Sequence, residues 1–341
     1  MLKKIYESIM EFILENKKEI IFLLSFYILM TYPLPYYVLV SGGTIDVSDR
    51  VEIEEEYEQK GSFNLSYVNE LEGTLPTVLL SFVMPHWTLY EESVYTIDET
   101  ESIAEITARD QMYLLESLQN SVKIAYEKAG KEMNITETNY YIYYVYDFVK
   151  EYSSLRVGDI LKKYDDKDLT DIDEYSKYIQ TKKVGEEVKI EFKRGDKIIK
   201  SKLKVYEEEG KKYTGIMIKT LYNYETIPEI TFKFKSNESG SSGGLMLALA
   251  IYNKLTEEDI TKGLKIAGTG TIEENGRVGS IGGAEYKLKG AVKDKADIFI
   301  VPIGANYEVV KRLKEEENYD IEIIPVATFD EALEKLKEYK K

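Results

Sequence analysis

The chain has 341 residues, enough for two or three domains with buried cores, and its 43% hydrophobic composition is typical of a folded protein. The 45 basic and 61 acidic residues give a formal net charge of −16, which repels a phosphate backbone and argues against nucleic acid as a partner. There is no cysteine and only one histidine, His86. Disulfides and the usual zinc ligand sets are therefore excluded, and we expect no metal site.

The run from Ile20 to Val40 contains no charged residue. A helix needs about 20 apolar residues to cross a bilayer, and this run reaches that length. Four lysines precede it and several acidic residues follow it, which by the positive-inside bias places the N-terminus in the cytoplasm. We predict a cytoplasmic segment at 1–19 and an uncleaved transmembrane signal anchor at 20–40, with the rest of the chain outside the cell. A buried core helix and a cleaved signal peptide are the alternatives, but a small-residue cleavage pattern is missing.

Residues 41–138 combine strand and helix patterns. The segments 62–68 and 77–83 are rich in β-branched and aromatic residues and are predicted to form strands. An amphipathic helix is predicted at 108–129, and its apolar stripe is typical of core packing. The apolar residues of this stripe are Met112, Leu115, Leu118, Val122 and Tyr126. His86 lies in a turn-like stretch without a serine motif, so we assign it no catalytic role.

The pattern changes at residues 139–206 to strand, turn, strand, helix and a final hairpin. Residues 155–161 read L-R-V-G-D-I-L, and the hairpin turns at R-G-D in 194–196. This stretch resembles a PDZ domain, whose core motif is L-x-x-G-D-x-[IL]. The resemblance implies binding of an extended peptide as an added strand, with its C-terminal carboxylate held by backbone amides. A role as a spacer, or as a gate for the active site, stays open beside peptide capture.

A serine- and glycine-rich loop at 236–244 separates a predicted strand at 229–234 from an apolar helix at 245–254. Backbone N–H groups at a helix start are unpaired and can stabilise an oxyanion. With no cysteine and a distant histidine, a serine of this loop with a lysine base, Lys287, is the favoured pairing for covalent hydrolysis. The chain contains no P-loop and no complete dinucleotide motif, so we expect neither ATP nor another cofactor.

Residues 241–244 read S-S-G-G and residues 282–287 read G-G-A-E-Y-K. With these motifs the segment 226–338 resembles the proteolytic domain of Lon-type (S16) peptidases, which has P-S-A-G and G-G-x-x-x-K in their place. The whole chain is similar to the membrane-anchored, PDZ-containing Lon-like proteases of Gram-positive bacteria. The strings A-G-T-G-T-I at 267–272 and A-D-I-F-I-V-P at 296–302 also agree with the family.

The resemblance implies that Ser242 is the nucleophile, that Lys287 is the base and that Thr269 orients the lysine amine. Gly240 and Ser241 are predicted to support the loop. Ser241 and a glycine at 243 replace the family's proline and alanine, which should loosen the loop. The rival serines, Ser236, Ser239 and Ser241, lack the matched spacing and are interpreted as loop residues.

Together these inferences predict an α+β protein with an N-terminal transmembrane helix, a PDZ-like β-rich domain and a C-terminal Lon-type domain, with 41–138 packing against the last. The predicted function is that of an extracytoplasmic, membrane-anchored, ATP-independent serine endopeptidase that cleaves secreted or membrane peptides and proteins. The alternative is an inactive, membrane-anchored scaffold that binds peptides. A homo-oligomer is left open. As a base, Lys287 needs a pKa lowered from about 10.4 to about 7 or 8, which burial in an apolar pocket would favour.

Overall fold

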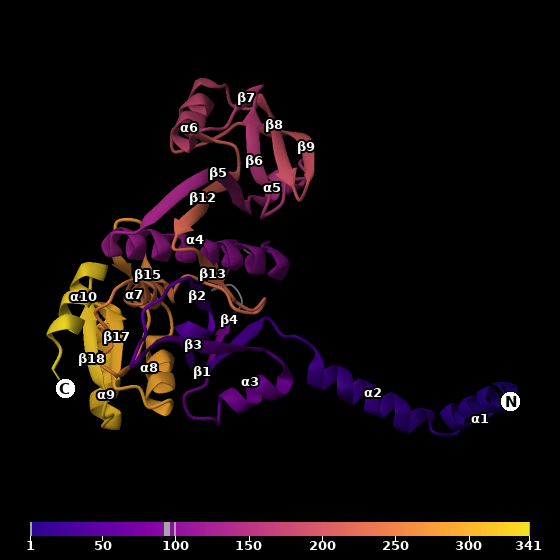
Figure 1. Cartoon of the computed structure of the whole chain (residues 1–341). Helices are drawn as coiled ribbons and strands as arrows, with labels where there is room; N and C mark the ends of the chain where they lie inside the picture. The colour runs from indigo at the N-terminus through magenta and orange to yellow at the C-terminus, as the bar shows by residue number, and fades with distance from the viewer. Residues whose placement is uncertain (1, 92–95, 99, 341) are drawn as a thin grey trace. The chain divides into compact units, whose positions relative to one another are not determined.

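The computed structural model describes residues 2–91, 96–98 and 100–340 (Figure 1). The chain forms two compact units, one of Met1–Gly42 with Val68–Tyr95 and one of Gly43–Tyr67 with Thr96–Lys341. All five residues of the predicted site, Ser242, Lys287, Thr269, Gly240 and Ser241, belong to the second unit.

The predicted transmembrane helix at 20–40 is wrong. Helix α1 (Leu2–Glu15) is followed by α2 (Lys17–Thr31), and strand β1 (Tyr36–Asp46) takes up the rest of the apolar run. Pro33 and Pro35 account for the break, because proline lacks an N–H and disfavours helical backbone in the residue before it. The 15 residues of α2 span about 22 Å at 1.5 Å per residue, less than the roughly 30 Å of a bilayer core.

Within the ranges that the structure describes, no helix is both long and apolar enough to span a membrane. The fold is therefore corrected to a mixed α and β structure in which the predicted span at 20–40 is a helix, a short connection and part of a strand. The predicted localisation, a single-pass anchor with a cytoplasmic N-terminus and an extracellular catalytic domain, loses the observation on which it rested.

The rest of the first unit contains helix α3 (Leu75–Ser81) and strand β4 (Thr88–Glu91), which pairs antiparallel with β1. The strand predicted at 77–83 is wrong because its residues fall largely in α3. The side chains of Thr74 and Thr77 form a reciprocal capping box, and a proline lies in the first turn, so the helix start is specified locally in spite of the β-branched content. The strand predicted at 62–68 is confirmed as β3 (Ser62–Glu72).

The PDZ-like part of the second unit is an antiparallel sheet with the strand order β12-β5-β6-β8-β9. Its own hydrophobic core includes Ile142, Leu161 and Phe192, all fully buried. The predicted strands, helix and hairpin are present, but the edge strand β12 lies beyond the predicted limit of residue 206. The elements of this part are β5 (Glu132–Val145), α5 (Asp147–Lys150), β6 (Ile160–Tyr164), β7 (Lys167–Asp168), α6 (Ile172–Thr181), β8 (Glu187–Arg194), β9 (Lys197–Lys204), β10 (Tyr206–Glu208), β11 (Lys211–Tyr213) and β12 (Ile216–Ile227).

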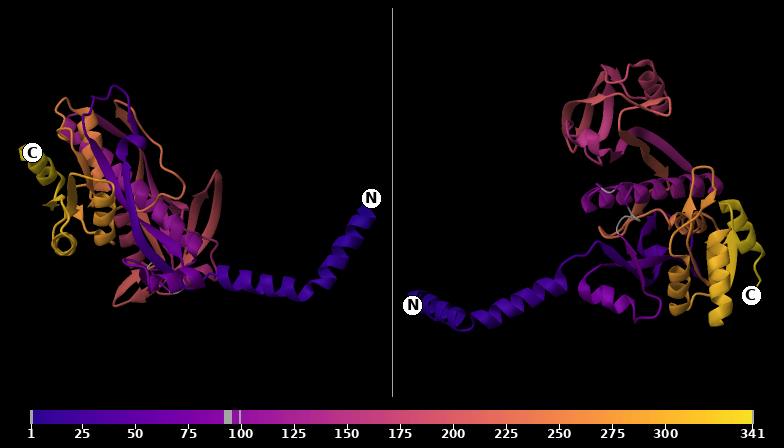
Figure 2. Two further views of the ribbon diagram at one scale, coloured as in Figure 1. Left: turned by 90° about the horizontal axis from the view of Figure 1, so that it is seen from below. Right: turned by 180° about the vertical axis from the view of Figure 1, so that it is seen from behind.

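The other part of the second unit is built on a parallel sheet in the order β18-β17-β14-β3. The strand β17 is buried along its whole length, as expected for a parallel sheet covered on both faces (Figure 2). Besides β3, the helices and strands of this part are η1 (Val47–Asp49), β2 (Val51–Ile53), α4 (Ile103–Ala129), β13 (Ile230–Phe232), α7 (Gly244–Leu255), β14 (Lys265–Gly268), β15 (Thr271–Ile272), β16 (Val278–Gly279), α8 (Ala284–Lys293), β17 (Ile298–Pro302), α9 (Ala305–Glu317), β18 (Glu322–Val326) and α10 (Phe329–Glu338).

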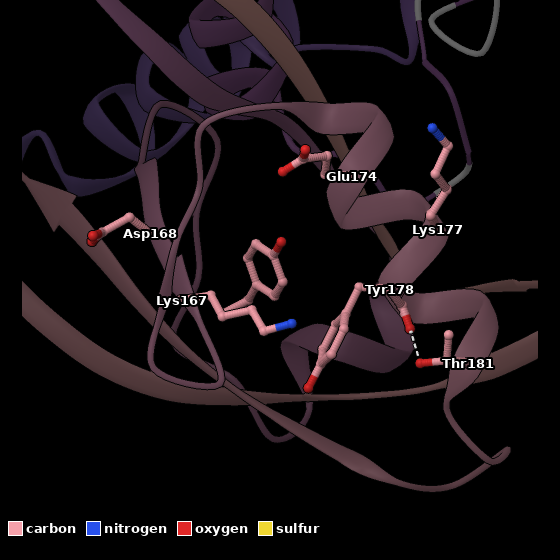
Figure 3. Close-up of a pocket in the computed structure, with 7 residues that line it drawn as sticks. Lys167, Asp168, Glu174, Lys177, Tyr178 and Thr181 are labelled. Atoms are coloured by element: carbon pink, nitrogen blue, oxygen red, sulfur yellow. Dashed lines mark hydrogen bonds between the residues drawn. The ribbon is translucent and has the colours of Figure 1, made fainter.

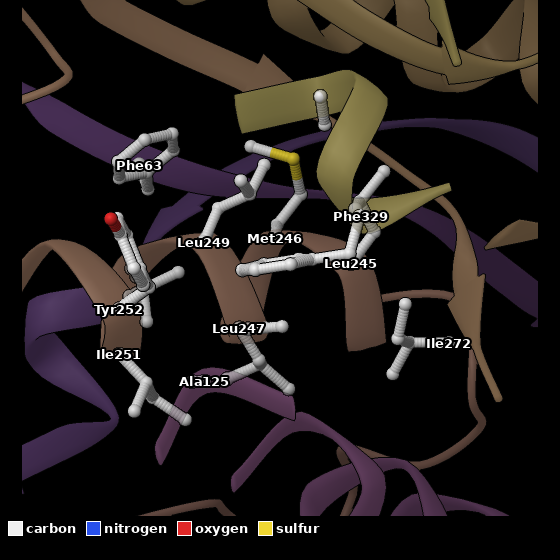
Figure 4. Close-up of a cluster of buried hydrophobic side chains, with 14 of the residues drawn as sticks. Phe63, Ala125, Leu245, Met246, Leu247, Leu249, Ile251, Tyr252, Ile272 and Phe329 are labelled. Carbon is white, nitrogen blue, oxygen red and sulfur yellow. The ribbon is translucent and has the colours of Figure 1, made fainter. Parts of the chain in front are cut away.

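Side-chain alternation divides the core of this sheet into two layers. Ile298 and Ile300 pack with α7 and α10, whereas Phe299 and Val301 pack with α8 and α9. Every residue of α7 is buried, and Figure 4 shows this helix surrounded by Phe63 of β3, Ala125 of α4 and Phe329 of α10. Because β3 and α4 precede the PDZ-like part in sequence and α7 follows it, that part interrupts a single core.

Candidate active site

Ser242 lies in the loop that leads into α7. Gly243 is the N-cap residue of that helix and no side chain caps it, so the helix start is left to backbone partners. The Ser242 carbonyl accepts hydrogen bonds from the Gly270 amide at 2.7 Å and from the Thr269 hydroxyl at 3.0 Å. The serine is therefore tied to the turn that follows strand β14.

Lys287 lies in the first turn of α8, which begins after Gly283 in left-handed backbone with φ of +66°. Its side chain runs into the protein, and the residue is only 4% exposed. The Nζ atom lies 2.9 Å from Ser242 Oγ and 3.2 Å from Thr269 Oγ1. The structure thus brings Ser242 together with Thr269 and Lys287, which follow it by 27 and 45 positions in sequence.

Thr269 connects the two. Its backbone amide donates to the Ile300 carbonyl at 3.0 Å, which fixes the residue against β17, and the residue is fully buried. Because its hydroxyl proton goes to the Ser242 carbonyl, the oxygen has only lone pairs to offer Lys287, so the lysine must donate to it.

Gly240 and Ser241, the predicted supporting residues, bond to the helices on either side. Gly240 has φ of +88°, a conformation that favours glycine, and its amide donates to the Asp110 carbonyl at 3.1 Å. The Ser241 carbonyl accepts from the Ser117 hydroxyl and from the Gly244 amide, both at 3.2 Å.

The loop is held more firmly than its composition predicts. Arg50 makes a bidentate pair with Glu238, with Nε and Nη2 donating at 2.8 Å and 2.6 Å. The amide of Lys235 also donates to Glu238, at 3.0 Å. Burial alone would raise the pKa of Glu238, but these hydrogen bonds outweigh it and the pKa is lowered. The same pair raises the pKa of Arg50.

The glycine at 243 has a packing reason. A Cβ atom added there would lie 2.9 Å from Cδ2 of the buried Leu65, so the alanine of the family motif does not fit without a shift. Glycine at position 243 thus leaves the space that the Leu65 side chain on β3 occupies.

The helix α4 contributes residues to the loop that the sequence interpretation missed. Leu115, which was placed in its apolar stripe, is 49% exposed, whereas Ser117 and Ser121 are buried at 2% and 0%. Gln111 Nε2 donates to the carbonyls of Ser236 and Glu238 at 3.2 Å and 3.3 Å. Polar residues at the positions of α4 that lie between its apolar core residues, such as Ser117 and Ser121, were the available signal.

A surface pocket lies on the PDZ-like part, against α6 and β7. Its volume is about 490 Å³, and it is lined by Tyr164, Lys167, Asp168, Glu174, Lys177, Tyr178 and Thr181 (Figure 3). Lys167 Nζ lies 4.4 Å from the centroid of the Tyr178 ring. The lining contains no member of the Ser242 site. Over the described residues, no group of three or more His, Cys, Asp or Glu side chains is placed to hold a metal ion.

The stretch of the chain that contains Ser242, Thr269 and Lys287 matches a known protein family. Residues 170–338 match the Lon protease (S16) C-terminal proteolytic domain. The match begins inside the PDZ-like part and includes Ser242, Thr269 and Lys287. It supports a serine peptidase.

Solved structures that resemble part of the chain include two PDZ domains. The PDZ domain of an SdrC-like protein from Listeria monocytogenes is 31% identical, with 25% of this chain and 90% of that chain covered and a TM-score of 0.23. The PDZ domain of an SdrC-like protein from Listeria innocua is 29% identical, with 24% and 92% covered and a TM-score of 0.22. A comparison with curated proteins finds no matching relative.

Proposed function

We propose that this chain is a serine endopeptidase that uses Ser242 as nucleophile and Lys287 as general base. The observation that carries the proposal is the 2.9 Å separation between Lys287 Nζ and Ser242 Oγ at a lysine that is 4% exposed. Nucleophile and base within hydrogen-bond reach, with a third group orienting the base, is the arrangement that covalent acyl transfer requires. Thr269 is that third group.

In the first step, Ser242 Oγ attacks the carbonyl carbon of a peptide bond and its proton passes to neutral Lys287. The tetrahedral intermediate collapses as the C–N bond breaks, and Lys287 returns the proton to the leaving amine. Water then attacks the acyl-enzyme, gives a proton to Lys287, and the released Ser242 oxygen recovers it. Each proton is accounted for by the one lysine.

Backbone N–H groups at the start of α7 are suited to stabilise the oxyanion. Among the hydrogen bonds of the described residues, the amides of Ser242 and Gly243 donate to no protein acceptor, whereas the Gly244 and Leu245 amides donate to the carbonyls of Ser241 and Gly270. Donors that are fixed before the reaction and point at the developing charge make the largest single contribution to the rate enhancement of many acyl-transfer enzymes.

The substrate class is peptides and proteins with accessible, loosely folded segments. A serine peptidase domain acts on peptide bonds, and a PDZ-like part offers an edge strand, β12, for extended chain. The chain has no P-loop, so we propose that cleavage proceeds without ATP.

Cleavage of fluorescein-labelled casein, an unstructured protein, tests the proposal. We expect Ser242→Ala to abolish cleavage, while Ser239→Ala, which changes an exposed serine of the same loop, leaves the rate close to that of the native protein. Unchanged cleavage by Ser242→Ala would show that the nucleophile is a different residue. A native protein that binds casein without cutting it would favour the inactive peptide-binding scaffold.

A further inference from the structure

The helix α4 holds the nucleophile loop at successive points although it contributes nothing to the proton transfers. The Gln111 side chain donates to two loop carbonyls, the Asp110 carbonyl accepts the Gly240 amide, and the Ser117 hydroxyl donates to the Ser241 carbonyl. The last of these contacts is next to the nucleophile itself.

We infer that Ser117 is a positioning residue that aims the backbone N–H of Ser242 at the reacting carbonyl; this inference rests on the proposed function. In a trans peptide the C=O and N–H bonds point in opposite directions within one plane. The Ser241 carbonyl and the Ser242 N–H belong to the same peptide. Because Ser117 draws that carbonyl toward α4, the N–H is directed away from α4 and is left without a protein acceptor among the described residues.

The neighbouring peptide is fixed from another element. The Ser242 carbonyl is held by Thr269 and Gly270, which determines the direction of the Gly243 N–H. The two candidate oxyanion donors are therefore set by different partners. Only the first of them depends on α4, so a change at Ser117 alters one donor and leaves the other in place.

Close packing at this point supports the assignment. Ser117 is 2% exposed, and a Cβ atom added to Gly244 would lie 2.6 Å from its Oγ. Both donors to the Ser241 carbonyl lie at 3.2 Å, so without the hydroxyl the carbonyl keeps one long hydrogen bond, from the Gly244 amide, in place of two. Fewer hydrogen bonds then fix the orientation of the peptide plane between Ser241 and Ser242.

Ser121 provides a matched control on the same helix. It is fully buried, and its hydroxyl lies within hydrogen-bond distance of two carbonyls, those of Ser117 at 2.6 Å and Gly244 at 2.9 Å. The N–H of that peptide belongs to Leu245 and is already bonded to the Gly270 carbonyl at 3.0 Å. Removing the Ser121 hydroxyl therefore costs a comparable buried hydrogen bond but frees no oxyanion donor.

The experiment compares the native full-length protein with Ser117→Ala, Ser121→Ala and Ser242→Ala. Initial rates on fluorescein-labelled casein give kcat and KM, a fluorophosphonate probe reports the rate of labelling at Ser242, and thermal unfolding gives Tm. We expect Ser117→Ala to lower kcat and the labelling rate by about 10-fold with KM unchanged, less than the roughly 10²–10³-fold cost of deleting such a donor. The loss should fall on kcat because the oxyanion contact is made only in the transition state. Ser121→Ala should lower Tm by a similar amount but leave kcat within about 2-fold of native, because it changes no oxyanion donor.

The possible failures are distinguishable. If the native protein neither cleaves casein nor is labelled at Ser242, or if Ser242→Ala still cleaves, the proposed function is overturned. If native protein is active and Ser117→Ala matches Ser121→Ala in kcat and labelling rate, the positioning role is overturned and Ser117 is a structural residue. A rise in KM without a change in kcat would also contradict it.

Discussion

The hydroxyl of Thr269 donates to the carbonyl of Ser242 at 3.0 Å and accepts from Lys287 Nζ at 3.2 Å, so one hydroxyl connects the backbone of the proposed nucleophile to the proposed base. The Ser242 carbonyl has a second donor in the Gly270 amide at 2.7 Å. Removing the threonine hydroxyl therefore leaves no buried carbonyl unsatisfied, and its effect should fall mainly on the lysine.

Thr269→Val tests this relationship because valine has nearly the same shape and no hydroxyl. A disoriented base should lower kcat by about 10- to 100-fold, part of the roughly 10²–10⁴-fold that a positioned base contributes. Thr269→Ser keeps the hydroxyl and should restore most of the rate. Casein cleavage by the three proteins measures this, and equal rates for valine and serine variants would remove Thr269 from the site.

Lys287→Arg should be inactive although it preserves charge and approximate length. The guanidinium stays protonated throughout the accessible pH range and has no lone pair to accept the Ser242 proton. Since nucleophile and base act as one unit, the double variant Ser242→Ala with Lys287→Arg should be no slower than either single variant. Measurable cleavage by Lys287→Arg, above the level of Ser242→Ala, would exclude the lysine as the base.

The Ser242 and Lys287 pair could be predicted from sequence because each residue belongs to a short motif, although 45 residues separate them. The partners on α4 could not. Ser117 is 124 positions from Ser241, and the whole PDZ-like part lies between them, so no local pattern connects the two. Contacts of that range depend on how α4 packs against α7, which periodicity does not specify.

The errors at the N-terminus have a common origin. Hydropathy over 20–40 counted a helix and a strand as one apolar run, and β-branched content at 77–83 outweighed a helix start at Thr74. In both places the local chemistry of Pro33 or of the capping box decided the backbone, and composition did not.

The Arg50–Glu238 pair should make stability depend on acid pH. The pKa of Glu238 is lowered in the fold, so the carboxylate stabilises the native state above the ordinary glutamate pKa of about 4.3, and this contribution is lost as pH falls through the lowered value. Native protein should have a higher Tm than Glu238→Gln at pH 7, with the difference shrinking below about pH 4. Melting curves between pH 7 and 3 measure it, and a difference that stays constant would contradict the assignment.

Asp110 should show the opposite sign. Burial raises the pKa of its carboxyl, with Arg109 partly opposing this, so the fold favours the protonated form. That contribution is present at low pH and is lost as pH rises through the raised value. Asp110→Asn keeps the backbone carbonyl that holds Gly240 and should therefore raise Tm at pH 7 but not at pH 3. A lower Tm at pH 7 would indicate that the ionised carboxylate has a stabilising partner.

Gly243 and Leu65 should be energetically coupled. A Cβ at 243 would lie 2.9 Å from Leu65 Cδ2, and because Leu65 is 8% exposed it has little room to move. Overpacking of this kind typically costs about 1–3 kcal/mol, so Gly243→Ala alone should lower the free energy of unfolding by about that amount. Leu65→Val alone leaves a small void and should also destabilise. Combined, the two changes should be less destabilising than the sum of the single variants, because the shorter valine vacates the space that the new methyl group needs. Denaturant unfolding of the four proteins measures the coupling, and strictly additive losses would show that the loop relaxes away from β3 and does not press against it.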